Sequence, residues 1–463
     1  MSLPSKAELQ EYYVGKDIAS VPKPAAVLDR AIIRRHCARM KRTVKALNVG
    51  FRAHVKTHKT LELTALQHDD DVVEANFIAS TILEIETILP FLKTLQESGK
   101  HHVNILHGIP LIPSQITRLA FLASKLGEDS ISLMIDHPDQ VRYLEPFYQA
   151  AGFPACVFVK VDTGYHRAGL PPLSLNKNGL LDKLAQAEKN GVARLIGLYS
   201  HSSLSYSATT AEEAMSHLTA EIRGCKDALD RWVGLLPQRE LVISVGATPQ
   251  AVSSHNLVPG EGKATLSSEA AELRALLRPA DTAGVKIKIE LHAGNYAVLD
   301  MQQISTHARL GAGGLEEEIA LSVVAEVCSV YNDGEREKPE ALVAAGTLAL
   351  GREPCGSYSG WGVLSSWGLD GEGEGGRLMV ERISQEHAIV SWEDEAQRRI
   401  SIPLQIGGLV KIFPNHACIT GAFYGWYFVV DSDIDSGASK IVDVWIRGRG
   451  SDITEPLLTT RTQ

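Results

Sequence analysis

Between about residues 49 and 291 the chain repeats one pattern of hydrophobic and polar positions. A short run rich in β-branched residues is followed by a polar turn and then by a longer segment with helical spacing. Eight strand-like runs follow this pattern, at 49–56, 72–80, 102–108, 131–136, 155–162, 194–201, 240–246 and 285–291. Short apolar strands that alternate with helices are typical of a parallel sheet. Eight such units in roughly 250 residues favour a closed (β/α)8 TIM barrel over a doubly wound open sheet.

The pattern changes after about residue 305. Strand-like runs then follow one another without long helices between them, and glycine, proline and acidic residues separate the runs. This is typical of a predominantly antiparallel β domain. We therefore predict an α/β protein with a barrel over 24–304 and a C-terminal β domain over 305–463, against which residues 1–23 pack. The strand-like run at 24–29 either lies across the barrel or joins the β domain.

Composition and charge exclude several classes of protein. The 463 residues include 46 basic and 55 acidic side chains, a net charge of −9, and no cluster of lysine and arginine that would favour nucleic acid. No window approaches the ~20 apolar residues of a membrane span, and no apolar segment resembles a signal peptide. The six cysteines are scattered without a CxxC pair, which suits a reducing compartment. We expect a soluble cytoplasmic protein without a nucleic-acid or membrane partner.

The first barrel strand ends in an unusual group of basic residues. Barrel enzymes carry their chemistry at the carboxyl ends of the strands. Alternation places Arg52, His54 and Lys56 on one face of this strand. Burial and neighbouring cations lower the pKa of a lysine and favour the neutral amine that forms a Schiff base. The alternative is a basic strand end in water, and this segment by itself leaves both interpretations open.

Further polar candidates follow the later strands. They are Arg167 after the fifth strand, Tyr199, His201 and Tyr206 at the sixth, Thr248 after the seventh, and Gly294 with Asn295 after the eighth. The loops after strands seven and eight form the usual phosphate site of such barrels. With Lys56 on the first strand, they indicate a cofactor that carries both an aldehyde and a phosphate.

One pair of residues in the second domain suggests a metal site. His416 and Cys418 lie two residues apart in FPNHACI, which we predict to be a strand. On a strand the imidazole and the thiolate would project to the same face and could converge on one ion. Two protein ligands leave coordination positions open, as catalytic zinc requires. Taken alone, such a pair is more often a buried histidine beside a buried cysteine.

Seven motifs occur in an order that resembles a known family. They are RAHVKTHK, STILEIE, KVDTGYHRAG, LYSH with a later tyrosine, VGATP, HAGNY and PNHAC. Over residues 22–447 the chain resembles the pyridoxal-phosphate enzymes of the alanine racemase-like fold. Within them it is most similar to the D-serine dehydratase branch, whose close relative is D-threonine aldolase.

The resemblance implies roles for individual residues. Lys56 would bind the cofactor aldehyde, and His416 and Cys418 would hold zinc. The other cofactor contacts would be Arg167 near the ring or its hydroxyl, Tyr199 at the pyridine nitrogen, Tyr206, Thr248, and Gly294 with Asn295 at the phosphate. The His-x-Cys form resembles the dehydratases, whereas the aldolases more typically carry His-x-Asp.

The implied activity is the elimination of water from the small molecule D-serine, dependent on pyridoxal 5'-phosphate and Zn2+, with pyruvate and ammonia as products. The alternatives are a D-threonine aldolase-type lyase and a dehydratase of another D-3-hydroxy amino acid. Lys23 replaces the usual threonine before the first-strand proline, and the stretch 202–205 lacks an expected glycine. These departures leave the substrate open. Because related barrels usually pair, we expect a homodimer.

Overall fold

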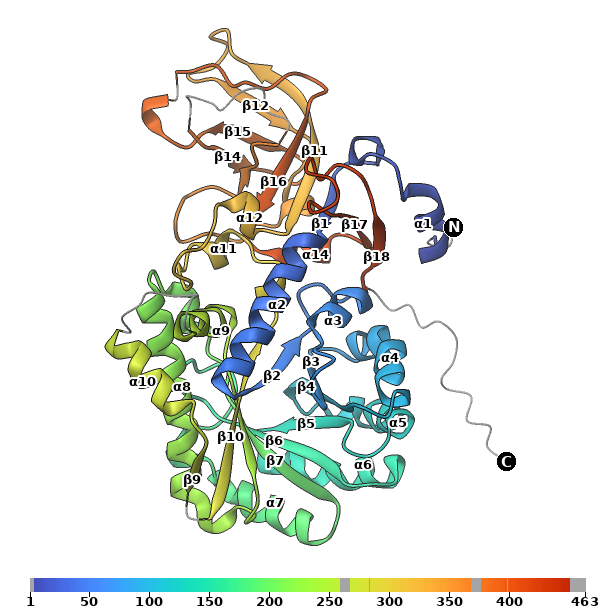
Figure 1. The fold of residues 1–463 in the computed structure, drawn as a ribbon, viewed down its shortest axis with the longest axis vertical. Helices are drawn as coiled ribbons and strands as arrows, with labels where there is room; N and C mark the ends of the chain where they lie inside the picture. Colours follow the sequence, from blue (N-terminus) through green and yellow to red (C-terminus); the bar gives the residue numbers. More distant parts are fainter. Residues whose placement is uncertain (1–3, 259–266, 283, 368–375, 398, 450–463) are drawn as a thin grey trace.

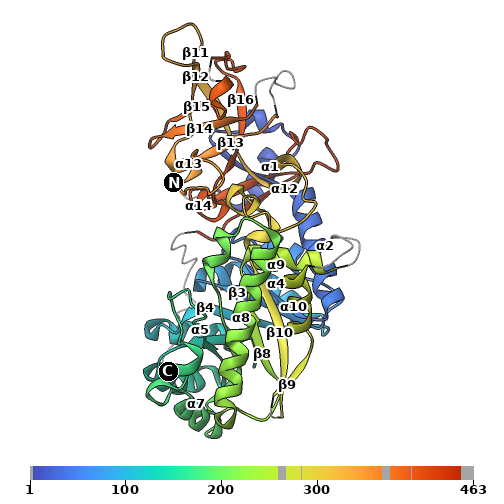
Figure 2. The same cartoon turned by 90° about the vertical axis from the view of Figure 1, so that its left-hand side faces the viewer.

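The computed structural model describes residues 4–258, 267–282, 284–367, 376–397 and 399–449. Within these ranges the strands form two nine-stranded sheets. One sheet closes into a barrel surrounded by helices, and the other forms a β domain that covers one end of the barrel (Figure 1). A view from the side shows the same stacking of the two domains (Figure 2). In the described part of the chain, no helix is long and apolar enough to cross a bilayer.

Eight parallel strands form the barrel, and each lies at one of the predicted runs. They are β2 (Gly50–His54), β3 (Glu74–Ala79), β4 (His102–Pro110), β5 (Ile131–Ile135), β6 (Ala155–Lys160), β7 (Ala193–Tyr199), β8 (Leu241–Val245) and β10 (Val285–Ala293). Each pairs with the next, and β10 pairs with β2 to close the ring. The short β9 (Ala280–Thr282) pairs antiparallel with β10 outside the ring. The predicted TIM barrel is confirmed.

Helices surround the ring, and most of them bury one apolar face in the core. They are α2 (Arg30–Leu47), α3 (Leu61–Gln67), α4 (Ile82–Glu97), α5 (Ile116–Leu126), α6 (Leu144–Ala151), α7 (Leu180–Lys189), α8 (Ala211–Trp232), α9 (Thr248–Ser253) and α10 (Ser268–Leu276). Helix α8 shows why such segments fold. Thr210 caps its first turn by accepting a hydrogen bond from the Glu213 amide. Leu218, Ile222 and Leu229 then recur at helical spacing and are fully buried.

The β domain is mostly antiparallel, as predicted. Its sheet runs in the order β12 (Glu340–Val343), β15 (Ala388–Trp392), β14 (Leu378–Ile383), β13 (Gly362–Leu364), β16 (Leu409–Pro414), β11 (Leu321–Tyr331), β1 (Ala25–Asp29), β17 (Trp426–Val430) and β18 (Asp443–Ile446). Strand β1 pairs antiparallel with β11 and parallel with β17. The run at 24–29 therefore joins the β domain, so the predicted barrel range 24–304 includes one strand of the other domain. Helix α1 (Lys6–Tyr13) packs through Leu9 against the same domain.

Two of the strand-like runs after residue 305 end in helices instead of continuing as strands. The run at 340–350 becomes α13 (Thr347–Leu350) after β12, and the run at 409–420 becomes α14 (Ala417–Ala422) after β16. Pro414 has no amide hydrogen with which to continue a strand ladder, and β16 ends there. The short helices α11 (Met301–Ile304) and α12 (Leu315–Glu318) connect the barrel to β11. Helices α11 and α14 lie at the junction of the two domains (Figure 1).

Candidate active site

A cavity of about 290 Å3 lies between the carboxyl ends of the barrel strands and the β domain. Eight of the nine predicted site residues line it. They are Lys56, Arg167, Tyr206, Thr248, Gly294 and Asn295 from the barrel, and His416 and Cys418 from the β domain. The fold thus brings together residues that are up to 362 positions apart in the sequence, as the interval from Lys56 to Cys418 shows. Tyr199 does not line the cavity.

Lys56 follows the end of β2 and is half-buried at the cavity wall. Its backbone amide donates a hydrogen bond to Nδ1 of His54 at 3.3 Å. Burial lowers the pKa of His54 and that of His201 far below the ordinary value, and the nearby charge of Lys56 lowers both further. Both imidazoles are therefore neutral at neutral pH.

Arg52 has a different environment from the one its position in the sequence suggests. It points into the barrel interior, where its Nε donates to Oε1 of Glu290 at 2.7 Å and both side chains are buried. Its Nη1 also donates to Oδ1 of Asn104 at 2.7 Å. The carboxylate of Glu290 thus neutralises part of the positive charge predicted for this face of strand β2. The alternative interpretation, a basic strand end in water, is wrong because Arg52 and His54 are buried.

Tyr199 lies behind the cavity wall, in contact with a residue that does line it. Its ring stacks on the imidazole of His292 with a centroid distance of 4.4 Å and an angle of 4°. His292 is also stacked beside His201, at 5.7 Å. Burial raises the pKa of the Tyr199 phenol above its ordinary value, so the hydroxyl stays protonated at neutral pH. His292 is not among the predicted site residues, although it is the first residue of the HAGNY motif that contributes Gly294 and Asn295.

Two glycines allow the strand ends to approach each other closely beside the cavity. At Gly294 an added Cβ would lie 2.9 Å from the carbonyl oxygen of His54. At Gly246, where φ is +137°, it would lie 2.6 Å from the carbonyl oxygen of His292. Helix α9 begins at Thr248, and its N-cap residue Ala247 provides no side-chain hydrogen bond to the first turn. This part of the wall therefore combines a close-packed backbone with first-turn amides that no capping side chain occupies.

His416 and Cys418 converge through a helix, which corrects our prediction of a strand. His416 is the N-cap of α14 and Cys418 is the second residue of that helix. Both side chains line the cavity, and Sγ of Cys418 donates a hydrogen bond to Oγ1 of Thr57 at 3.2 Å. Burial opposes charge on both groups, but their mutual attraction prevails. It raises the pKa of His416 to about 9 and lowers that of Cys418.

Asp300 fixes the position of this pair relative to the barrel. Its Oδ2 accepts hydrogen bonds from the amide of Ala417, at 2.8 Å, and from Nδ2 of Asn295. Its Oδ1 accepts from the amide of Gln303 at 2.9 Å and so caps α11. One buried carboxylate therefore connects Asn295 of the barrel with the turn that carries His416. The sequence offers little sign of this role, because Asp300 stands alone in an otherwise apolar segment.

Comparison with known proteins agrees with the fold and with the site. The profile of the alanine racemase N-terminal domain matches residues 28–259, and that of a serine dehydratase domain matches residues 320–430. The barrel, the β domain and the cavity between them thus define an enzyme of the alanine racemase-like class.

Full-length relatives narrow this class to a family. The chain is 33% identical over 451 residues to the D-serine dehydratase of Schizosaccharomyces pombe, and the match covers 96% of each chain. It is 28% identical over 463 residues to the D-serine dehydratase of Saccharomyces cerevisiae, covering 95% of this chain and 99% of the relative. The chain belongs to the D-serine dehydratase family, which is a family of lyases.

A solved structure shares the whole architecture. D-threo-3-hydroxyaspartate dehydratase from Delftia sp. HT23 superimposes with a TM-score of 0.70 at 25% identity, covering 94% of this chain and 100% of that one. One solved form of that enzyme carries alanine in place of a histidine. Another, described as metal-free, carries alanine in place of a cysteine two residues further along.

Proposed function

We propose that this chain is a D-serine dehydratase that uses pyridoxal 5'-phosphate and Zn2+ to convert D-serine into pyruvate and ammonia. The observation that carries the proposal is the meeting of Lys56 with the His416–Cys418 pair in one cavity. A lysine suited to bind an aldehyde and a donor pair suited to zinc are the two elements that this elimination requires. The names of the yeast relatives support the choice of substrate.

The cavity fits the organic cofactor. Lys56 offers the amine that would bind its aldehyde, and Arg167 and Tyr206 line the same space. Thr248 and the first turn of α9 would hold its phosphate, together with the backbone at Gly294, where an added Cβ would clash with strand β2. We keep Tyr199 as a proposed indirect contact, because its ring reaches the cavity through the stacked His292.

The donor set of His416 and Cys418 fits a metal ion. Imidazole nitrogen and thiolate sulfur are both preferred ligands of zinc, and the soft sulfur disfavours magnesium or manganese. Both side chains line the same cavity, and each favours the charged form of the other. A solved form of the related dehydratase is described as metal-free, which supports a metal site in an enzyme of this architecture.

The chemistry divides between the bound groups and the chain. When bound, pyridoxal phosphate would withdraw electrons from the α-carbon and zinc would stabilise the charge that develops on the β-hydroxyl. The ε-amine of Lys56 would take the α-proton as general base. Neutral His201 and His292 add no competing charge to this wall. Loss of the α-proton and of hydroxide leaves an enamine, which takes up water and releases ammonia to give pyruvate.

The decisive test is pyruvate release from D-serine by the purified protein, before and after treatment with a chelator. We expect pyruvate from the untreated enzyme, its loss after chelation and its return when Zn2+ is restored. Full activity after complete metal removal would contradict the role of zinc. A protein that retains bound cofactor but makes no pyruvate with zinc present would contradict the choice of D-serine.

A second candidate is the dehydration of another D-3-hydroxy amino acid. The structural similarity to D-threo-3-hydroxyaspartate dehydratase favours it. Comparing kcat/KM for D-serine and D-threo-3-hydroxyaspartate separates the two dehydratases. Formation of glycine and an aldehyde from D-threonine would instead indicate the aldolase-type alternative.

We also propose that the enzyme acts as a cytoplasmic homodimer. All six cysteines are free thiols, which supports a reducing compartment. Light scattering behind a gel-filtration column is the test of the assembly, and a mass of two chains is the expected result. Elution at the mass of one chain would contradict the dimer.

A further inference from the structure

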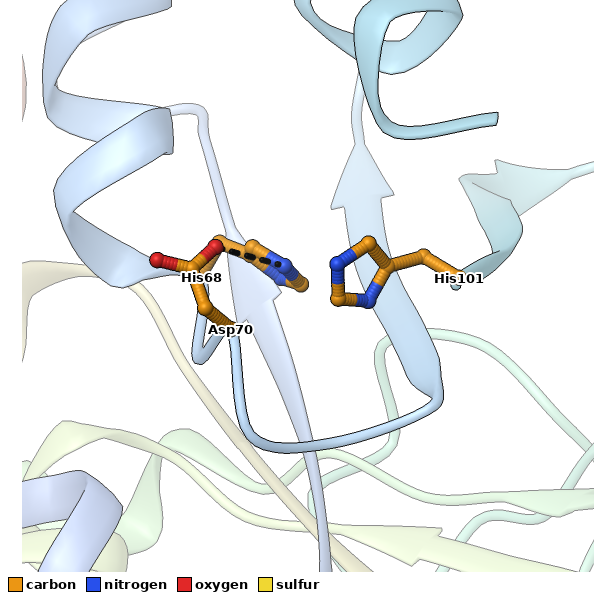
Figure 3. Close-up of side chains that lie close together, drawn as sticks. All are labelled: His68, Asp70 and His101. Carbon is orange, nitrogen blue, oxygen red and sulfur yellow. Dashed lines mark ion pairs between the residues drawn. The ribbon is translucent and has the colours of Figure 1, made fainter. Parts of the chain in front are cut away.

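Three side chains that the proposed reaction does not use converge at the opposite end of the barrel. His68 ends helix α3, Asp70 follows it in the turn before β3, and His101 immediately precedes β4. They therefore belong to two neighbouring connections at the amino ends of strands, whereas the cavity with Lys56 lies at the carboxyl ends. Figure 3 shows the two imidazole rings turned toward each other, with the carboxylate of Asp70 beside His68.

The donor atoms of this group lie within reach of one ion. One ligand atom from each of His68, Asp70 and His101 lies within 4.8 Å of the other two. Nε2 of His68 is 3.6 Å from Oδ1 of Asp70. The rings of His68 and His101 are nearly perpendicular, at 84°, with centroids 4.6 Å apart. A cation between the three atoms would need only small side-chain rotations to bind them all.

Two independent observations indicate that the group is prepared for a ligand. His68 is only 6% exposed, yet its buried Nε2 has no hydrogen-bond partner. A buried polar atom without a partner is energetically unfavourable unless something binds it. In addition, Nδ1 of His101 lies 2.9 Å from the carbonyl oxygen of Val72, to which it must donate. That hydrogen bond places the proton on Nδ1 and leaves the lone pair of Nε2 free for a metal, as in many zinc sites.

We propose that His68, Asp70 and His101 form a second metal site, which binds a divalent transition metal of the zinc class. Two imidazoles with one carboxylate favour zinc, cobalt or nickel over calcium and magnesium, which prefer oxygen donors. Asp70 is 93% exposed in its side chain, so water completes the coordination. This site does not depend on the proposed dehydratase activity.

The position of the site points to a structural role. The metal would join the turn after α3 to the turn before β4, which are already linked by a hydrogen bond from the His102 amide to the carbonyl oxygen of Val73, at 2.8 Å. In barrel enzymes this end contributes to stability, and the opposite end carries the chemistry. Occupation of the site should therefore raise the melting temperature without changing turnover.

The test is titration of the full-length protein, freed of metal, with Co2+ while its visible spectrum is recorded. We expect His101→Gln to bind one equivalent fewer than the wild type, and Asp70→Asn to bind that equivalent at least about 10-fold more weakly. The lost equivalent should contribute d–d bands without a sulfur-to-cobalt charge-transfer band. A sulfur-to-cobalt band would come only from cobalt bound to Cys418. If the proposed active-site metal does not exist, that band will be missing, but the d–d bands of the His68, Asp70 and His101 site will still be lost in His101→Gln.

Matched controls come from neighbouring residues. His102→Gln changes an adjacent exposed histidine, and Asp71→Asn changes an exposed carboxylate in the same turn. Both should bind as many equivalents as the wild type. Equal binding by the wild type, His101→Gln and Asp70→Asn would overturn the proposal. Because Asp70 is exposed, its variant should fold even if substitution of the half-buried His101 prevents folding.

Discussion

The thiol of Cys418, on the β domain, donates a hydrogen bond to Oγ1 of Thr57, on the barrel, at 3.2 Å. Thr57 is the residue immediately after Lys56. The contact therefore places the proposed metal ligand next to the proposed cofactor lysine across the domain boundary. Hydroxide is a poor leaving group, and a metal that assists its departure must lie close to the group that removes the α-proton. The contact between the two domains therefore lies where the proposed metal ligand and the proposed general base are next to each other.

Replacing Lys56 by alanine should abolish pyruvate formation. The general base would be absent, an effect worth about 10²–10⁴-fold by itself, and the covalent link to the cofactor would be lost as well. The visible absorbance of the bound cofactor should therefore disappear with the activity. Lys45→Ala removes a lysine from the exposed surface near the C-terminus of α2 and serves as the control, for which both readouts should match the wild type. Retention of the cofactor band by Lys56→Ala would contradict the assignment.

Replacing Cys418 by alanine should separate the metal from the organic cofactor. The variant should retain the cofactor absorbance, because Lys56 is intact, but lose zinc and elimination activity. Metal analysis beside a pyruvate assay measures both effects. Cys328→Ala, at an exposed cysteine of the same domain, is the matched control and should behave as the wild type. Wild-type turnover by Cys418→Ala would refute the participation of the thiolate.

Replacing Asp300 by asparagine should weaken zinc binding while Lys56 keeps its cofactor. Asparagine keeps one oxygen and carries an NH2 group in place of the other, and an NH2 group cannot accept a hydrogen bond. The variant therefore loses either the two bonds from Ala417 and Asn295 or the bond from Gln303. Loss of a group that orients ligands typically costs about 10–100-fold in metal affinity. Competition with a chelator of known affinity gives the zinc constant. An unchanged constant would show that Asp300 does not position the pair.

Breaking the buried pair of Arg52 and Glu290 should destabilise the barrel. Arg52→Met leaves the carboxylate buried without its cation, at a cost of about 3–5 kcal/mol. The double variant Arg52→Met/Glu290→Leu removes both charges and should regain most of this stability. Denaturant unfolding of the wild type, both single variants and the double variant measures the coupling. Additive losses would indicate that the two side chains act independently.

Glu318 should make stability depend on pH. Burial alone would raise its pKa, but hydrogen bonds from His36, the Gly313 amide and Arg309 lower it well below the ordinary value of 4.5. The unfolded chain therefore takes up the proton first. The stabilisation is complete above about pH 4.5 and is lost as pH falls further toward the folded-state pKa, by about 1.4 kcal/mol per pH unit.

The variant Glu318→Gln lacks this dependence. We expect it to be less stable than the wild type at pH 7 by about 3 kcal/mol, because the half-buried Arg309 loses its partner. The difference should narrow as pH falls below 4.5. Denaturant midpoints at pH 7 and pH 3.5 test this, and an equal difference at both values would contradict the assignment. Glu316→Gln, two residues earlier in α12, is a control that leaves the Arg309 pair in place.

The alternation of apolar runs and helical segments was sufficient to predict the eight barrel strands and the antiparallel second domain. It sufficed because strands and helices bury their apolar faces with different periods, which the order of residues alone reveals. The barrel motifs likewise identified six residues that line one cavity, since strand ends of a parallel barrel must meet at one edge. The resemblance to a known family added His416 and Cys418 of the β domain.

Tertiary structure decided what depends on contacts between distant segments. Strand β1 joined the β domain because β11 and β17 provide its hydrogen-bonding partners, and both lie about 300 or more positions later in the sequence. Glu290, His292 and Asp300 acquired their roles from neighbours on other strands and helices. His68 and His101 likewise meet only because β3 and β4 are adjacent. The local sequence pattern predicts which face of a helix or strand is buried. Which residues pack against that face depends on segments far away in the sequence, so only the tertiary structure shows them.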